Sequence, residues 1–449
     1  MPDTVLKDGI EMNLDTAGKS VRPTQDLVVC TGAKPVSFLT LLLLFLASIL
    51  TTLGFWFLLP DRVFLKESAD YRAFYHPVGR SIADGRGIRG DDGAPATRYP
   101  PGFALLVAGA LVASEALHAP ETLPLRVLNL FALATSSIFL FQIAYTIFGL
   151  APALVSYGLW LSYPFVVALT KAPGTELPFC ALVFAAFHVA WRAIDQNQLH
   201  ASRCLLIGLL LGYAMLVRPI GIGLGVLTAA FLFRFQAARN ISQRLRPIGL
   251  ILLGNLMVVL PWEAWAYSQS GQWILLSTGG PPGMRDGLTF AVHPDKRYRV
   301  ETRIPADAEL VSQAIVAHYR SLDSASDILG ILATQFRESP RGVAELLLVK
   351  AVRSWYATDS GRLDRYILPI QIVYLSLAIW ATVISFRTSA SGRRLSVVVW
   401  LSVLYFWMMT VSVLSILRYM IPAMGLLFLL IPALLRRAAE PAGQTAPAA

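Results

Sequence analysis

Long stretches of apolar residues constrain this chain more than any other feature of its sequence. A helix of about 20 predominantly apolar residues crosses the hydrocarbon core of a bilayer. Charged residues make up only 15% of the 449 residues, too few to cover a soluble protein of this size. We therefore expect an all-α polytopic membrane protein with about ten transmembrane helices. The apolar stretches are Val36–Leu59, Leu123–Phe148, Pro152–Thr170, Leu177–Ala193, Leu205–Val217, Ile220–Phe233, Ile248–Ala266, Tyr366–Phe386, Leu395–Leu417 and Tyr419–Leu435.

Lys and Arg residues gather between particular pairs of these stretches, and this grouping predicts the orientation of the chain. Cytoplasmic loops carry an excess of such residues. We interpret the net charge of +10 as this bias rather than as a surface for nucleic acid. The groups are Lys19, Arg22 and Lys34; Arg192 and Arg203; Arg234, Arg239, Arg244 and Arg246; Arg387, Arg393 and Arg394; and Arg436 and Arg437.

All these groups face the cytoplasm only if an even number of crossings separates each pair. That condition holds if a further apolar run, Gly102–Leu117, forms a re-entrant or interfacial helix that does not cross. We therefore predict ten crossings, with both termini in the cytoplasm. The alternative is that Gly102–Leu117 makes an eleventh crossing and that the N-terminal basic residues have little influence on orientation.

This orientation divides the chain into five parts. Two tails are predicted in the cytoplasm, two modules in the membrane, and one long loop on the outer side. The parts are the tail 1–35, the N-terminal transmembrane module 36–266 with its first outer loop 60–119, the helical outer loop 267–365, the C-terminal transmembrane helices 366–435, and the tail 436–449.

The outer loop 267–365 has the sequence pattern of short amphipathic helices. On the last of them, an apolar stripe of Val343, Leu346, Leu347 and Ala351 is expected to be buried, with Lys350 and Arg353 elsewhere on the helix. On the first, Leu310, Val311, Ala314 and Ile315 are expected to share one face. The helices are Ala308–Tyr319 after a capping Asp307, Ile328–Phe336 after a capping Asp327, and Arg341–Tyr356 after Ser339 and a first-turn Pro340.

Basic residues also lie at the predicted outer ends of spans, where the orientation rule predicts few. Lys171, Arg218 and Arg418 each occupy a tight outer turn. A single arginine at such a place commonly extends to the lipid headgroups. Several together favour a phosphate group, because the guanidinium fork matches phosphate oxygens. A lipid with a phosphate head would present that group at this depth.

Asp70 is the candidate acid of the first outer loop, in the polar segment Asp61–Tyr99. If the ligand is a sugar linked to a lipid phosphate, the phosphate leaves as a stable anion without a general acid. One carboxylate then suffices as base for an acceptor hydroxyl. The alternative is a solvated loop acid or a cap for a helix over Tyr71–Ala83.

Other chemistries have less support. The six histidines form no pair with the spacing of a metal site, and no nucleotide-binding or serine-hydrolase motif is present. The three cysteines, Cys30, Cys180 and Cys204, are interpreted as small apolar residues. No cofactor is expected from these patterns.

Six short motifs in this order and spacing resemble the glycosyltransferase C superfamily, multi-spanning enzymes that use polyprenyl-phosphate sugars. Within this superfamily, the motifs are most similar to those of the bacterial branch that resembles protein O-mannosyltransferases and lipid A aminoarabinose transferases. The motifs are Asp70-Tyr71 with Gly85; Arg98-Tyr99-Pro100-Pro101-Gly102; Gly174 to Phe179; Leu216-Val217-Arg218-Pro219; Pro261-Trp262 with Gly271 to Thr278; and Arg418 to Pro422.

The resemblance implies roles for single residues. Asp70 matches the catalytic acid of the first loop, and Arg98, Arg218 and Arg418 are expected to bind the donor phosphate. Many relatives have a second acid where this chain has Tyr71, and some have an acid where it has Thr97. These departures leave the substrate and the metal dependence open. Residues that could touch a substrate are Arg72, Tyr99, Lys171, Glu176, Lys350 and Arg353.

Together these points predict a membrane glycosyltransferase, with module 36–266 as its catalytic part. It would move a sugar from a polyprenyl-phosphate donor to an acceptor hydroxyl with inversion, on the periplasmic face of the bacterial inner membrane. The acceptor, such as a lipopolysaccharide, another glycan or a protein, is not specified by the sequence. The alternatives are a lipid or sugar transporter or flippase, which internal repeats typically mark, and a scaffold, which would not explain the outer basic turns.

Overall fold

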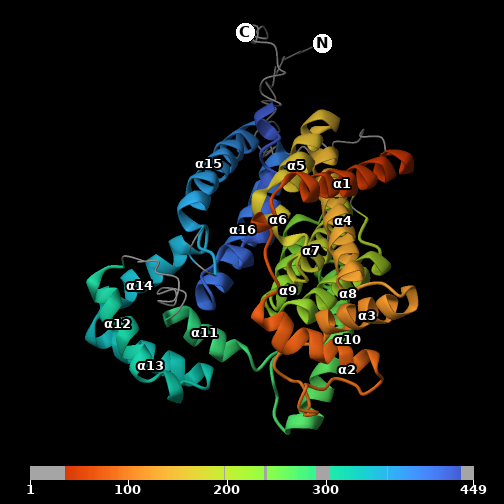
Figure 1. The fold of residues 1–449 in the computed structure, drawn as a ribbon. Helices are drawn as coiled ribbons and strands as arrows, with labels where there is room; N and C mark the ends of the chain where they lie inside the picture. Colours follow the sequence, from red (N-terminus) through yellow and green to blue (C-terminus); the bar gives the residue numbers. More distant parts are fainter. Residues whose placement is uncertain are drawn as a thin grey trace, which may run out of the picture.

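The chain is an all-α polytopic membrane protein, as its sequence predicts (Figure 1). The computed structural model describes residues 36–196, 198–236, 240–289, 304–359, 361 and 363–435, so the two predicted tails and Cys30 lie outside the described residues. In that part of the chain the only extended pairing is an isolated bridge between Arg89 and Pro95.

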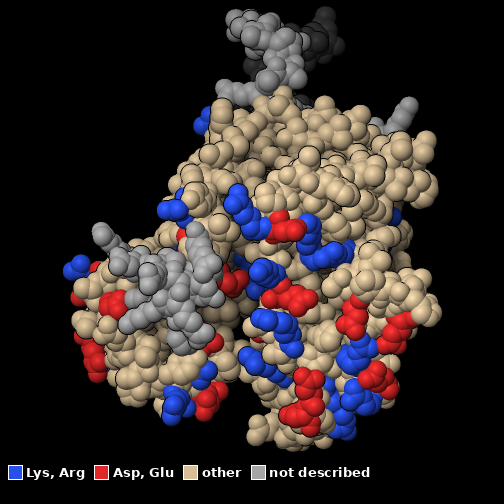
Figure 2. Space-filling model, in the orientation of Figure 1, with Lys and Arg blue, Asp and Glu red and all other residues tan. Residues whose placement is uncertain are grey.

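Six of the described helices are long and apolar enough to cross a membrane, and each corresponds to a predicted span. The apolar upper half of the face drawn in Figure 2 carries few charged side chains, whereas Lys, Arg, Asp and Glu gather over its lower half. This division is expected when lipid surrounds one part and water the other. The six helices are α1 (Phe38–Leu58), α4 (Thr122–Phe148), α7 (Glu176–Asp195), α10 (Ile241–Ser270), α15 (Asp364–Thr388) and α16 (Ala390–Ser412).

The other four predicted crossings are shorter apolar helices, and proline or glycine marks the point where several begin or end. The predicted span Pro152–Thr170 is divided at Tyr163, because Pro164 cannot donate the backbone hydrogen bond that would continue the helix. α8 ends before Arg218-Pro219, as predicted. These helices are α5 (Leu150–Ser162) with α6 (Pro164–Leu169), α8 (Ala201–Val217), α9 (Leu224–Phe235) and α17 (Ile421–Phe428).

The candidate re-entrant run forms α3, with the same bounds, Gly102–Leu117, as the sequence predicts. Its first residue lies against the end of α8. A side-chain carbon added at Gly102 would lie 2.4 Å from the carbonyl carbon of Leu216, and the Tyr213 hydroxyl donates to the Gly102 carbonyl at 3.1 Å. The start of α3 is therefore held beside Arg218. That α3 does not cross the bilayer stays a prediction.

α8 and α10 approach closely because glycines line their contact. A side-chain carbon at Gly208 would lie 2.2 Å from the Ile251 carbonyl oxygen, and one at Gly254 would lie 2.5 Å from that of Leu205. Small residues let helix backbones approach in this way. The contact fixes the direction of α8 and with it the position of Arg218 at its end.

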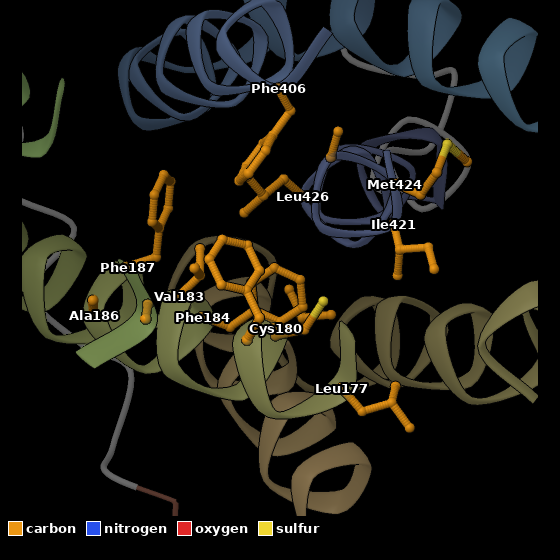
Figure 3. Packing of buried hydrophobic residues seen from close by; sticks show 14 of the residues in the cluster. Leu177, Cys180, Val183, Phe184, Ala186, Phe187, Phe406, Ile421, Met424 and Leu426 are labelled. Carbon is orange, nitrogen blue, oxygen red and sulfur yellow. The ribbon is translucent and has the colours of Figure 1, made fainter. Parts of the chain in front are cut away.

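α17 passes through the interior of the molecule, and every one of its side chains is buried. In Figure 3, Cys180 and Phe184 of α7 point toward α17 and toward Phe406 of α16. Cys180 and Cys204 are free and buried, consistent with small apolar residues. Packing along α7 and α17 brings the beginnings of the two helices together, and these carry Glu176 and the turn with Arg418.

The described residues of the predicted outer loop 267–365 form a helical lobe beside the main body (Figure 1). Its apolar cluster contains Leu288, Ala308, Val311, Ile315, Leu322, Ile328, Val343 and Leu346. Four described helices build it: α11 (Gly280–Thr289), α12 (Ala306–Ala317), α13 (Ala325–Glu338) and α14 (Pro340–Arg353).

Two predicted caps in this lobe are wrong. α12 follows Pro305, and Asp307 lies in its first turn without capping it. α13 begins at Ala325 and is capped by Ser324, whose side chain accepts from the Asp327 backbone N–H while Asp327 bonds back to Ser324. Sequence alone favoured the acid over the serine three residues earlier, although the two form one capping box. Ser339 and Pro340 begin α14 as predicted.

The predicted faces of α12 and α14 also need correction. Leu310 is 64% exposed, and α12 buries Ala308 and Ser312 with Val311 and Ile315. On α14, Lys350 and Arg353 share the buried face with Val343 and Leu346, whereas Leu347 is 41% exposed. Spacings of three and four residues place these side chains on one face of a helix. The prediction that Lys350 and Arg353 lie elsewhere on the helix was wrong because it assumed that this face is purely apolar.

Candidate functional site

Asp70 lies directly before the helix that the sequence predicts over Tyr71–Ala83. That helix starts with a wider π-helical turn, Tyr71–Tyr75, and continues as α2, His76–Ala83. Asp70 makes no capping hydrogen bond with its side chain. Its carboxylate Oδ1 instead accepts a hydrogen bond from the Tyr99 hydroxyl at 3.2 Å, and the residue is half-buried. The structure thus removes the helix-cap alternative for this acid.

Aromatic rings hold the Tyr99 hydroxyl beside Asp70. The Tyr99 ring stacks on Tyr75, with centroids 5.5 Å apart, and meets the edge of Phe74 at 5.1 Å. Tyr75 packs in turn against Phe103 at the start of α3. Burial, and then the charge of Asp70, raise the pKa of the Tyr99 hydroxyl to about 12. At neutral pH this hydroxyl therefore stays protonated and donates to the carboxylate.

The beginning of segment 267–365, the predicted outer loop, covers the Arg98-Tyr99 segment. The Arg98 carbonyl accepts from the Gly279 backbone N–H at 3.1 Å and from the Ser277 hydroxyl at 2.5 Å. A side-chain carbon at Gly279 would lie 2.8 Å from the Tyr99 ring. The Arg98 guanidinium is exposed and lies 5.4 Å from the centroid of the Tyr99 ring. This places the Arg98 charge next to Tyr99, whose hydroxyl donates to Asp70.

Arg218, Arg418 and Glu176 come together from three turns that are distant in sequence. Arg418 donates to Glu176 Oε1 from Nε at 2.8 Å and from Nη2 at 2.6 Å. Arg218 Nη1 lies 3.4 Å from the same oxygen and 3.5 Å from the Arg418 carbonyl oxygen. Glu176 is 1% exposed and Arg218 5%. We call these three residues the arginine–glutamate cluster.

Two tyrosines join this cluster to Asp70. The Arg218 guanidinium lies 4.6 Å from the centroid of the Tyr419 ring. The charges of Arg218, Arg418 and Asp70 all act on the Tyr419 hydroxyl. Burial raises the pKa of Tyr75, on which Asp70 and Arg218 likewise act. Asp70 and the cluster are therefore within electrostatic reach of the same two side chains.

The remaining predicted site residues make their contacts elsewhere. Lys171 pairs with Asp61 at 2.7 Å and lies over the Phe64 ring. Lys350 donates to the Val413 carbonyl at 3.0 Å, and Arg353 lies 3.6 Å from Asp364. Arg72 is exposed on the first loop.

Sequence reasoning missed three residues of the site: Tyr75, Asp359 and Tyr419. Asp359 Oδ2 lies 3.6 Å from Arg418 Nη1. Tyr419 follows Arg418 directly, and its pairing with Arg218 has no signature in sequence spacing. Within the described ranges, no group of three or more His, Cys, Asp or Glu residues could hold a metal ion.

One comparison with known proteins, the match to a family model, agrees with the resemblance of the sequence motifs. Residues 100–265, which include Glu176 and Arg218, match the family model described as dolichyl-phosphate-mannose-protein mannosyltransferase. Among solved structures, the chain is similar to ArnT from Cupriavidus metallidurans bound to undecaprenyl phosphate. The two share 14% identity over 90% of this chain and 79% of that one, with a TM-score of 0.38. None of the curated proteins compared matches the sequence.

Proposed function

We propose that this protein is a membrane glycosyltransferase that moves a sugar from a polyprenyl-phosphate donor to an acceptor hydroxyl, with Asp70 as the base. The family match over residues 100–265 supports a membrane glycosyltransferase with such a donor. The side of the membrane, the role of Asp70 and the inversion of the sugar are our own further steps. We assign the reaction to the periplasmic face of the bacterial inner membrane, by the distribution of Lys and Arg between the spans.

One observation carries the proposal: the half-buried Asp70 carboxylate, the buried Arg218 and the half-buried Arg418 act electrostatically on the same tyrosine, Tyr419. Asp70 is fixed by the Tyr99 hydroxyl at 3.2 Å, and Arg218 and Arg418 are fixed by Glu176. A base and an anion site that act on the same side chain are what we expect of an enzyme that transfers a sugar from a sugar phosphate. Guanidinium groups in a site of low dielectric bind phosphate strongly.

The reaction follows from these positions. Asp70 accepts the proton of the acceptor hydroxyl as its oxygen attacks the anomeric carbon of the sugar. The bond from that carbon to the phosphate oxygen breaks, and its electron pair stays on the phosphate. Attack opposite the leaving phosphate inverts the anomeric configuration. The products are the glycoside, the lipid phosphate and a protonated Asp70, which returns its proton to water.

Arg98, Arg218 and Arg418 are proposed to hold the donor phosphate, Arg98 from the exposed side. Arg72, Tyr99 and Glu176 are the candidates for further contact with substrate. The contacts of Lys171, Lys350 and Arg353 favour structural roles in the loops that surround the site.

The test is transfer by the purified full chain in lipid vesicles that contain a radiolabelled polyprenyl-phosphate sugar. The protein is supplied with candidate acceptors: a lipopolysaccharide core, a wall glycan and an unfolded secreted protein. We expect label on one acceptor and release of lipid phosphate. Movement of the intact labelled lipid between leaflets, without cleavage, would instead establish a flippase, and no product in either assay would contradict the proposal.

A further inference from the structure

We propose that Glu176 sets the net charge of the phosphate site, so that the site holds the donor phosphodiester and releases the more highly charged lipid monophosphate product. This inference rests on the proposed function. It gives Glu176 the role of a positioning and selectivity residue for the leaving phosphate.

The geometry makes Glu176 an internal substitute for phosphate. Its Oε1 accepts from Arg418 at 2.6 and 2.8 Å and lies 3.4 Å from Arg218 Nη1. A buried carboxylate that accepts from a guanidinium in this way is ionised. The longer distance to Arg218 leaves that arginine the easier one for a phosphate oxygen to engage. Glu176 thus keeps both cations in place before the donor arrives.

The charges of the three residues in the arginine–glutamate cluster sum to one positive charge. Arg218 and Arg418 contribute two positive charges, and Glu176 contributes one negative charge. Asp359 also faces Arg418, but it is 61% exposed and lies 3.6 Å away, so water and salt screen it. Arg98 is exposed as well. The arginine–glutamate cluster therefore has the charge that neutralises one phosphodiester anion.

The donor and the lipid product differ in charge. A sugar phosphodiester carries one negative charge, whereas a phosphate monoester carries about 1.5 to 2 at pH 7. With the full charge of two arginines, the site would favour the monoester over the diester by a larger margin. With Glu176 in place, the difference in binding free energy between monoester and diester is smaller, since the additional negative charge of the monoester is attracted by a smaller net positive charge. The carboxylate thus keeps product from occupying the site after transfer.

Gly174 supports this role, because the residue leaves room for the carboxylate. A side-chain carbon at position 174 would lie 2.5 Å from Glu176 Oε2. That oxygen is buried and has no hydrogen-bond partner in the part of the chain that the structure describes. Gly174→Ala would therefore displace the flexible end of Glu176 rather than the backbone. It offers a way to weaken the Glu176–arginine contacts without removing the acid.

The experiment measures binding of two probes to the full chain in lipid nanodiscs by titration calorimetry at pH 7.5. Farnesyl phosphate represents the monoester, and methyl farnesyl phosphate represents the diester. We expect Glu176→Gln to increase the ratio of monoester to diester affinity by about tenfold or more, as removal of one nearby charge implies. Glu176→Asp, which keeps the charge, should stay near the wild-type ratio.

Two further variants separate charge from structure. Asp359→Asn removes an exposed carboxylate that faces the same arginine, and it should change the ratio by less than about threefold because solvent screens it. Gly174→Ala should shift the ratio in the direction of Glu176→Gln by a smaller factor. In turnover assays, Glu176→Gln should lower kcat and KM together and make the lipid monophosphate a stronger inhibitor.

A folded Glu176→Gln protein with an unchanged affinity ratio, or with weaker binding of both probes, would overturn the inference. If Glu176→Gln does not fold, an unchanged ratio in Gly174→Ala overturns it in the same way. Binding that follows the expected pattern in a wild-type protein that transfers no sugar would instead contradict the proposed function and leave the charge effect standing.

Discussion

At the scale of single residues, buried charges in this protein have two kinds of environment. Glu176, Arg218 and Arg418 compensate one another, which is how a charge is normally tolerated in an interior. Lys350 is 1% exposed, and its ammonium donates only to the backbone carbonyl of Val413 among the described contacts. Burial lowers the pKa of Lys350 to about 7. One buried cation therefore lacks the compensation that the arginines have.

Because Lys350 is buried, we expect the stability of the folded protein to depend on pH. The pKa of Lys350 is 10.5 when unperturbed and about 7 in the fold, so between these values the unfolded chain binds more protons. The cost of burying the charge is fully present below pH 7, and stability rises as the pH increases from about 7 toward 10.5. Lys350→Met removes this dependence. The difference in Tm, variant minus wild type, should therefore fall between pH 6 and pH 9.

Thermal unfolding in detergent at several pH values measures this difference. Lys66→Met, at an exposed position of the first outer loop, is the matched control and should give a difference that does not vary with pH. A constant difference for Lys350→Met as well would mean that Lys350 is protonated in the fold throughout this range.

At the scale of elements, the site depends on where helices end and how closely they cross. α8 ends at Val217 because Pro219 follows, and its direction is fixed by glycines that face α10. The sequence showed the first feature, since a proline break is local. The contact of Arg218 with Glu176 could not be predicted in the same way, because Glu176 and Arg418 come close to each other only when α7 and α17 pack together. Lys350 was misplaced for the same reason: its burial depends on α11 and α16, not on α14 alone.

The α8–α10 contact gives a prediction for a glycine pair within one helix. A methyl group at Gly254 meets backbone atoms of α8, so Gly254→Ala should destabilise the protein by about 1–3 kcal/mol, the usual cost of overpacking. Gly249→Ala lies on the same helix with nothing within 4 Å and should have little effect. The Tm of each variant in detergent measures the effect. Equal Tm values for the two variants would show that α8 and α10 can move apart without loss of stability.

At the scale of the whole molecule, segments that the orientation rule assigned to the outer side meet at one site. Contacts join Asp70 to Tyr99, Arg98 to Ser277, and Glu176 to both arginines. Segments that meet in this way share one side of a membrane. The positions of Lys and Arg predict the parity of the crossings, which stays a prediction. The convergence on two tyrosines could not be predicted, since it depends on the packing of several helices.

The topology predicts which positions react with a membrane-impermeant thiol reagent on intact cells. Single cysteines at Asp91 in the first outer loop and Ser326 in the loop 267–365 should be labelled from outside, since both positions are exposed. A cysteine at Ser242, exposed at the start of α10, should react only after the membrane is permeabilised. Labelling of Ser242 in intact cells, or of Asp91 only after permeabilisation, would reverse the orientation.

The most direct test of the account is the initial rate of sugar transfer by Asp70→Asn, with Asp91→Asn as the matched control. Asp70→Asn keeps the shape of the side chain and can still accept from Tyr99, but it cannot take a proton from the acceptor. We expect its rate to fall by about 10²–10⁴, the usual contribution of a general base, with Tm and donor binding unchanged. Asp91→Asn, at an exposed position of the same loop, should transfer at the wild-type rate. A near-normal rate in Asp70→Asn would contradict the account, because another group would then have to take the proton of the acceptor hydroxyl.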